Sequence, residues 1–395
     1  MTKFRRAIAA LFAMIALQLQ SGAVAQTPET ERHYLSGKGP KDAVLWDFTV
    51  DGGRRAGEHA KIPVPSQWEQ HGFGEYNYGQ TRAPKLNEKG FYRRQFSVPT
   101  SWKGKRVRLV FEGVMTDATV KVNGVEAGPT HQGAFYRFHH DVTKLVKFGA
   151  DNVVEVEVAK ASANPDTNRG ERLADYWVFG GIFRPVWLEV SPIEAIEHVA
   201  IDARADGNLT ADVTLLAART ATRIQGRLLT NDGKSVGEPF GVIVPGGGAG
   251  RLRLSTRLDR PALWTAERPN LYRLQLTLMQ GDKPVHQLTQ RFGFRTFEVR
   301  RGRGLFLNGQ RILLKGVNRH AFRPATGRAL DPEDSYDDVR LVRAMNMNAI
   351  RMAHYPPDEA LLEAADELGL YVLDELSGWQ HAHDTAAGRK LVRAM

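Results

Sequence analysis

Apolar and polar residues alternate with period two along much of the first half of the chain. The runs Arg106–Val114 and Asn152–Lys160 are clear examples, and this period is typical of strands with one buried face. Asn123-Gly124 separates two such runs, and Asn-Gly between alternating runs indicates a tight hairpin. Many short strands joined by turns are typical of a sandwich of two sheets. The pattern therefore predicts a β-sandwich of the jelly-roll type over residues 26–192.

The alternation resumes after residue 192 in a second set of strands. Leu209–Ala218, Arg223–Thr230 and Leu271–Met279 all show it, and the glycine run Gly246–Gly248 indicates a loop. About seven strands over roughly a hundred residues match the size of an immunoglobulin-like sandwich. The sequence predicts such a domain at residues 193–299.

The period changes to a helical one after residue 300, where strands and helices alternate. The predicted order is a strand at Arg311–His320, a helix at Asp334–Asn346 with Asp334 or Ser335 as N-cap, a strand at Ala349–Tyr355, a helix at Asp358–Leu368, a strand at Tyr371–Glu375 and a helix beginning at Ala386. Alternation of this kind favours right-handed βαβ units and a parallel sheet. A TIM (β/α)8 barrel needs eight units and about 250 residues. Residues 300–395 therefore predict the first three units of an incomplete barrel.

Composition narrows the class of protein. Of the 395 residues, 42% are hydrophobic and 25% charged, the balance of a globular protein. The absence of Cys excludes disulfides, cysteine nucleophiles and cysteine metal sites. The formal charge of +10 comes from scattered Lys and Arg without a long basic block, so we expect no nucleic-acid partner.

The N-terminus has the order of a secretory signal. A basic segment, Met1–Arg6, precedes the apolar run Ala7–Leu19 and the A-x-A site Ala23–Ala25. We expect residues 1–25 to be a cleaved signal peptide and the mature chain to begin at Gln26, in the periplasm or the medium. The alternatives are an uncleaved anchor or a buried helix. The sequence has no second long apolar run, so we expect no other membrane span.

Polar side chains end all three predicted barrel strands. His320 ends the first, Arg351 and His354 the second, and Asp374 and Glu375 the third. The carboxyl ends of barrel strands face the active-site mouth, so the pattern favours a ligand site. Three alternatives stay open: Arg351 and Glu375 form a buried ion pair, the histidines are satisfied interior residues, or the histidines bind a metal ion.

The motifs around these residues resemble glycoside hydrolase family 2, the β-galactosidases, β-glucuronidases and β-mannosidases. The resemblance lies in "LLKGVNRHAFRP" and "NAIRMAHYPPDEALLEAADELGLYVLDE", with "GIFRPVWLEV" and "FGFRTFEV" in the two predicted sandwiches. It implies exo-hydrolysis of a β-glycoside with retention, carried out by an acid/base Glu and a nucleophilic Glu. In the family these follow the fourth and a later barrel strand, and Glu375 matches neither. We therefore assign no catalytic residue and expect this chain to be the inactive N-terminal part of a β-galactosidase-like enzyme. The alternative is a non-catalytic exported carbohydrate-binding protein.

The resemblance also implies substrate-contacting residues. His320, Arg351 and His354 match sugar-site positions of the family, although Ala353 replaces a serine, and Glu375 lies beside them. Asp166 and Asp175 fall in a Gly/Arg/Asn-rich loop similar to one that reaches the substrate in β-galactosidases, and ordinary turn chemistry explains them almost as well.

The segment after Glu375 departs from the β-galactosidase pattern. Trp379 stands where that pattern has a magnesium-binding Glu, and His381 stands at its His position. We therefore expect no cofactor and regard magnesium as doubtful. Trp379 is a candidate platform for stacking a sugar or, alternatively, a packing residue at a helix cap. The implied partner is a carbohydrate; the sugar, the linkage and the oligomeric state are not specified by the sequence.

Overall fold

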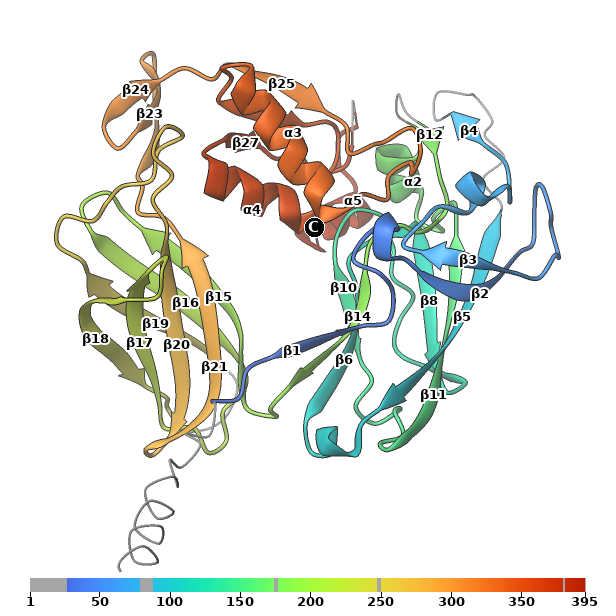
Figure 1. Cartoon of the computed structure of the whole chain (residues 1–395), viewed down its shortest axis with the longest axis horizontal. Coiled ribbons are helices and arrows are strands. Elements are labelled where there is room, and N and C mark those ends of the chain that lie inside the picture. The colour runs from blue at the N-terminus through green and yellow to red at the C-terminus, as the bar shows by residue number, and fades with distance from the viewer. Residues whose placement is uncertain (1–26, 79–87, 174–176, 247–249, 379–380, 395) are drawn as a thin grey trace, which may run out of the picture.

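The computed structural model describes residues 27–78, 88–173, 177–246, 250–378 and 381–394. Two sandwiches stand side by side, and a smaller α/β part lies across their upper ends (Figure 1). The predicted signal peptide and Gln26 lie outside the described residues. Among the described residues, no helix is long and apolar enough to cross a membrane.

The first sandwich is the predicted jelly roll, built from a four-stranded sheet in the order β1-β14-β6-β10 and a six-stranded sheet in the order β3-β2-β5-β11-β8-β9. The strands of the four-stranded sheet are β1 (Glu31–Tyr34), β6 (Arg106–Phe111), β10 (Phe138–Asp141) and β14 (Val186–Ser191). Those of the six-stranded sheet are β2 (Val44–Val50), β3 (Ala60–Val64), β5 (Lys89–Val98), β8 (Asp117–Val122), β9 (Val125–Glu126) and β11 (Ala150–Ala159). Short pairs β4 (Asn77–Tyr78) with β12 (Trp177–Val178) and β7 (Val114–Met115) with β13 (Gly181–Ile182) complete it, together with helix α2 (Pro165–Glu171).

The alternation in β11 shows why these residues form a sandwich. Val154, Val156 and Val158 are almost fully buried in the core, while Glu155 and Glu157 between them face outward. Successive side chains of a strand point to opposite faces, so this sequence gives one buried apolar face and one face toward solvent. Burying the apolar face at about 25 cal/mol per Å² drives the two sheets together.

The second sandwich consists of the sheets β15-β16-β19 and β18-β17-β20-β21. Its strands are β15 (Ala195–Ala203), β16 (Asn208–Ala217), β17 (Arg223–Thr230), β18 (Ser235–Ile243), β19 (Arg251–Arg257), β20 (Tyr272–Gln280) and β21 (Lys283–Phe292). Leu274, Leu276 and Leu278 of β20 are fully buried between the sheets. This is the immunoglobulin-like sandwich that the sequence predicts.

The third part is a parallel sheet, β25-β26-β27, with helices α3, α4 and α5. A small antiparallel sheet of β22 (Phe297–Arg300), β23 (Gly304–Leu307) and β24 (Gln310–Ile312) precedes it. The barrel elements are β25 (Gly316–Arg319), α3 (Pro332–Ala344), β26 (Ala349–Met352), α4 (Glu359–Leu368), β27 (Tyr371–Leu373) and α5 (Ala386–Ala394). Helices α3 and α4 cover one face of the sheet, where Ile350 packs with Val339, Val342 and Leu361.

Two local predictions in this part are wrong. The run Arg311–His320 is not one strand, because β24 turns back onto β23 before β25 begins. Helix α3 begins earlier than expected, with Asp331 as N-cap, and Asp334 occupies the third helical position of a capping box. The carboxylates of Asp331 and Asp334 accept from N–H groups at the helix start, and Pro332 at the first helical position has no N–H that needs a partner.

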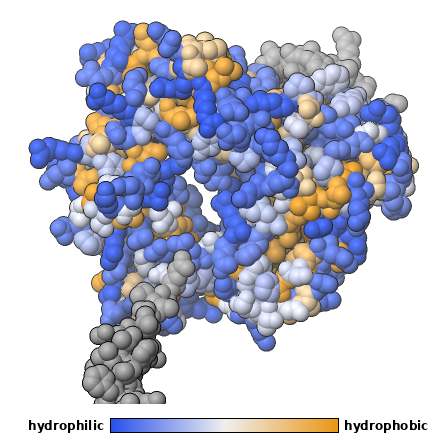
Figure 2. Space-filling view, in the orientation of Figure 1, coloured by the Kyte–Doolittle hydropathy of each residue, from blue (hydrophilic) through white to orange (hydrophobic). Residues whose placement is uncertain are grey.

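His286 of β21 joins the start of the chain to the junction between the two sandwiches. Its ring is fully buried; Nδ1 accepts a hydrogen bond from the Ile196 N–H at 3.1 Å, and Nε2 lies 3.0 Å from the Thr30 hydroxyl. It also lines a cavity of about 920 Å³ between the sandwiches, where Figure 2 shows a hollow with hydrophilic residues on both sides. Since Nδ1 is an acceptor, the imidazole is neutral, and a second ring proton would face the Ile196 N–H.

We expect His286 to make the junction sensitive to acid. Burial lowers the pKa of His286 from 6.5 to about 4, so the unfolded chain takes up its proton first as the pH falls. The contribution of neutral, buried His286 to the free energy of unfolding is therefore complete above pH 6.5 and is lost as the pH falls from about 6.5 to 4. Within this range the free energy of unfolding is expected to fall by about 1 kcal/mol per pH unit. Urea unfolding of the wild type and of His286→Gln across this range measures it, and parallel pH profiles for the two proteins would contradict it.

Candidate functional site

The register of the parallel sheet determines which residues are neighbours at the candidate site. Asn318 of β25 pairs with Arg351 of β26, which in turn pairs with Leu373 of β27. Beyond this layer the chain continues into the segments that carry His320, His354 and Glu375. The predicted groups therefore share the carboxyl end of one sheet, as the barrel geometry requires.

Glu375 is the centre of the cluster. Its Oε1 accepts from Nε of Arg351 at 2.6 Å and lies 2.6 Å from Nη2 of the same guanidinium, and its Oε2 lies 3.4 Å from Nδ1 of His354. The side chains of Arg351, His354 and Glu375 are 35%, 14% and 24% exposed. The Arg351–Glu375 ion pair is thus real, and it is open to solvent rather than sealed in the core.

The two histidines meet edge to face above this pair. The ring centroids of His320 and His354 are 5.2 Å apart at an angle of 84°. His320 is exposed, whereas His354 is largely covered. The structure therefore brings together four predicted residues, His320, Arg351, His354 and Glu375, from three different strand ends.

Asn318 belongs to the same cluster although the sequence analysis did not assign it to the site. Its Oδ1 accepts from Nη1 of Arg351 at 3.4 Å. Its position at the end of the first barrel strand, in register with Arg351, is the signal that identifies it. Asp374 also lies here: its Oδ1 accepts from the Glu375 N–H at 2.8 Å, and partial burial raises the pKa of its carboxyl group.

The jelly roll fixes the loops that carry the histidines. The ring of Phe135 stacks on Tyr355 with centroids 4.2 Å apart and an angle of 13°. Arg184 donates from Nη1 to the Phe135 carbonyl at 3.0 Å and from Nη2 to the Pro356 carbonyl at 2.9 Å. A buried apolar cluster surrounds these contacts and contains Met115, Ala134, Phe135, Phe179 and Phe183 of the jelly roll with Ala321 and Tyr355 of the barrel.

Asp166 lies in a helix, not in the loop that its composition suggested. Asn164 caps the short helix α2, accepting from the Asp166 N–H at 3.0 Å. The Asp166 carboxylate accepts from the Thr385 hydroxyl and pairs with Arg169, so it braces the segment after β27 against the jelly roll. Its assignment as a sugar ligand stays a prediction. Asp175 and Trp379 lie outside the described residues.

No group of three or more His, Asp or Glu side chains among the described residues has a geometry that could hold a metal ion. His381 packs against His383 with ring centroids 4.7 Å apart, and Nε2 of His383 donates to the Ser377 carbonyl at 2.6 Å. His383 is thus engaged with the backbone. The expectation of no cofactor stays a prediction.

A separate cavity lies on the same sheet and is lined mostly by apolar side chains. Its volume is about 1120 Å³, and Ile350, Leu373, Phe297 and Leu307 give it a largely apolar wall. Asn318 and Arg351 line it, whereas His320, His354 and Glu375 do not. Convergent polar groups orient a bound ligand, so the histidine–carboxylate cluster is the better candidate site.

Three family models match the chain in succession. "Glycosyl hydrolases family 2, sugar binding domain" matches residues 54–192, "Glycosyl hydrolases family 2" matches residues 194–295, and "Glycosyl hydrolases family 2, TIM barrel domain" matches residues 297–392. Together they span the jelly roll, the immunoglobulin-like sandwich and the barrel segment.

Individual proteins agree with these models. A protein named putative beta-glucuronidase from Formosa agariphila is 31% identical over 320 residues, which cover 80% of this chain and 37% of the relative. A beta-galactosidase from Thermoanaerobacter pseudethanolicus is 31% identical over 301 residues, 74% of this chain and 40% of the relative. The crystal structure of a putative beta-galactosidase from Bacteroides fragilis superposes with a TM-score of 0.74 at 26% identity, covering 88% of this chain and 53% of that chain.

The chain thus matches about two fifths of the length of these two curated relatives. The order of the matched models is the order of its three structural parts. The chain belongs to glycoside hydrolase family 2.

Proposed function

We propose that this chain supplies the sugar-recognition part of a retaining exo-β-glycosidase that acts on a β-galactoside or β-glucuronide. The observation that carries the proposal is the cluster of Glu375 with Arg351 and His354, with His320 beside it. Sugar hydroxyls are both donors and acceptors. A carboxylate held by an arginine offers free acceptor positions, and an adjacent imidazole offers a donor.

The cluster suits binding rather than bond cleavage. Retention requires a proton donor and a nucleophile whose carboxyl groups lie about 5 Å apart. The Glu375 carboxylate is already engaged by the Arg351 guanidinium through Oε1, so it has a structural partner. We therefore propose that Glu375 orients the sugar and that the 395-residue chain alone does not hydrolyse glycosides.

Binding of a sugar lactone tests the proposal. The 395-residue chain is expected to bind galactono-1,5-lactone or glucaro-1,4-lactone, measured by isothermal titration calorimetry. Replacing His354 with Ala removes a donor to the ligand and is expected to weaken binding about 10- to 100-fold, the range for a hydrogen bond to a charged or strongly polarised group. His59→Ala is the matched control, since His59 is exposed on the jelly roll away from the cluster.

The same preparations test turnover. No hydrolysis of aryl β-galactosides or β-glucuronides above background is expected. Hydrolysis that disappears in Glu375→Gln would show that Glu375 is catalytic and would overturn its assigned role. Lactone binding equal in the wild type and in His354→Ala would remove His354 from the site, and no binding by the wild type would reject the proposed function.

A further inference from the structure

Tyr355 links the two loops that carry the histidines of the site. It follows His354 directly in the chain, and its hydroxyl oxygen accepts a hydrogen bond at 3.1 Å from the N–H of Ala321, which directly follows His320. This hydrogen bond therefore joins the residue after His320 to the residue after His354. Both Tyr355 and Ala321 are buried, at 3% and 6% exposure.

The jelly roll contacts both Tyr355 and the residue that follows it. Its ring stacks on Phe135, and the guanidinium of Arg184 joins the carbonyl of that same Phe135 to the carbonyl of Pro356. The Arg328 guanidinium lies 4.5 Å from the Tyr355 ring centroid. Phe135 and Arg328 therefore hold the ring, Arg184 holds the backbone of the next residue, and the hydroxyl is left aimed at the loop after β25.

We propose that Tyr355 is a positioning residue, anchored on the jelly roll, that sets the spacing of His320 and His354 for sugar binding. Its hydroxyl acts through Ala321 on His320 and through the chain on His354, and does not itself touch the ligand. This inference rests on the proposed function only where it concerns sugar.

A phenylalanine at this position would fill the same space and keep the stack on Phe135. Packing alone therefore does not require the hydroxyl. The Ala321 N–H does, because a buried N–H without an acceptor is costly. The hydroxyl is thus the part of Tyr355 that distinguishes a positioning role from core packing.

Tyr355→Phe in the 395-residue chain is the direct test, and Tyr336→Phe is its matched control. The hydroxyl of Tyr336 in α3 also takes part in a hydrogen bond, donating at 3.1 Å to Oε2 of Glu367 on the helical side of the barrel. Tyr355→Phe is expected to weaken galactono- or glucaro-lactone binding about tenfold, because the loop that carries His320 loses the hydrogen bond that holds it and must be ordered when the ligand binds. Tyr336→Phe is expected to change the affinity less than twofold.

A mutant cycle separates positioning from general destabilisation. If Tyr355 acts through His320, then Tyr355→Phe should weaken lactone binding much less in a His320→Ala background, because coupled residues are not additive. Equal losses in both backgrounds would overturn the proposed route through His320.

Amide hydrogen exchange gives a readout that needs no sugar. Exchange in the peptide spanning residues 316–322 is expected to speed up in Tyr355→Phe and to stay at the wild-type rate in Tyr336→Phe. Unchanged exchange at Ala321 would overturn the positioning role whatever the ligand does. Faster exchange in a chain that binds no lactone would instead count against the proposed function and leave the link between the two loops standing.

Discussion

Replacing Lys160 with Met is expected to lower the free energy of unfolding of the jelly roll by about 3–5 kcal/mol, the cost of breaking a buried ion pair from one side. The Lys160 side chain is fully buried, and Nζ lies 2.7 Å from Oε1 of Glu69 and 3.2 Å from Oε2 of Glu88. The side chain of Glu69 is 0% exposed and that of Glu88 is 3% exposed. Without the lysine, the carboxylates of Glu69 and Glu88 would lie buried near each other without the ammonium group that now pairs with both.

The protonation of Glu69 sharpens this expectation. Burial raises the pKa of Glu69 to about 7, although Lys160 opposes the rise. Removing Lys160 takes away the largest opposing influence, so the Glu69 carboxyl is expected to be protonated at neutral pH. It would then lose its charge-assisted contact with the Gly180 N–H, now at 3.0 Å.

Urea unfolding followed by tryptophan fluorescence measures the loss, because Trp68 donates from Nε1 to Glu88 in the same network. Lys89→Met is the matched control. Lys89 pairs with Glu157 at 2.6 Å, but both side chains are exposed. Such a pair contributes about 0–1 kcal/mol. Similar losses in the two variants would show that burial does not decide the strength of the Lys160 pair.

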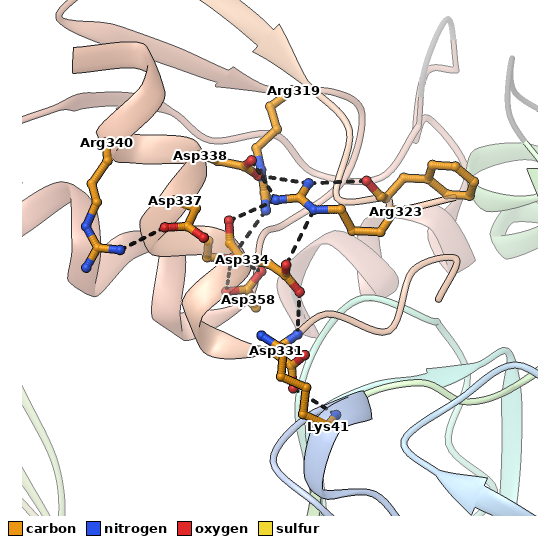
Figure 3. Close-up of polar contacts among 11 residues, drawn as sticks. Lys41, Arg319, Arg323, Asp331, Asp334, Asp337, Asp338, Arg340 and Asp358 are labelled. Carbon is orange, nitrogen blue, oxygen red and sulfur yellow. Dashed lines mark hydrogen bonds and ion pairs between the residues drawn. The ribbon is translucent and has the colours of Figure 1, made fainter. Parts of the chain in front are cut away.

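The second large effect is expected for Arg319→Met in the barrel segment. The Arg319 side chain is 7% exposed, and its Nε lies 2.6 Å from Oδ2 of Asp338. Nη2 donates to the Ser335 hydroxyl at 3.3 Å, and that hydroxyl donates to the Asp358 carboxylate, which caps α4. Figure 3 shows how this network joins the end of β25 to α3 and to the start of α4. Its loss is expected to destabilise the segment by about 3 kcal/mol.

Arg340→Met provides the control for this variant. Arg340 also pairs with an α3 aspartate, Asp337 at 2.8 Å, but its side chain is 51% exposed and faces away from the network (Figure 3). Its removal is expected to cost under about 1 kcal/mol. Limited proteolysis after residue 300, together with urea unfolding, checks both variants. Equal protease sensitivity of Arg319→Met and Arg340→Met would contradict the predicted difference.

Period-two alternation predicted the sandwiches well because strand geometry imposes that period on any half-buried strand. The valines of β11 and the leucines of β20 are buried as the pattern indicates. Helix α2 was missed for the converse reason. Its seven residues, PDTNRGE, contain no apolar side chain with a helical repeat, so no helical period marks them.

The site was predictable as far as strand order and register determine it. Arg351 lies in β26 and Glu375 follows the neighbouring parallel strand β27, and their meeting follows from the barrel pattern. The support of the histidine loops was not predictable in this way. Phe135 and Tyr355 are 220 residues apart in the chain, and no local pattern links one aromatic residue to the other.

That shared cluster has a consequence for biosynthesis. The residues that support the barrel loops, Phe135 and Arg184, leave the ribosome long before Tyr355 does. Domains generally fold in order of synthesis from the N-terminus. The jelly roll can therefore be complete when residues 320–356 emerge, and it offers them a finished surface on which to settle. In the nascent chain the jelly roll, which is synthesised first, can guide the folding of the barrel loops, which are synthesised last.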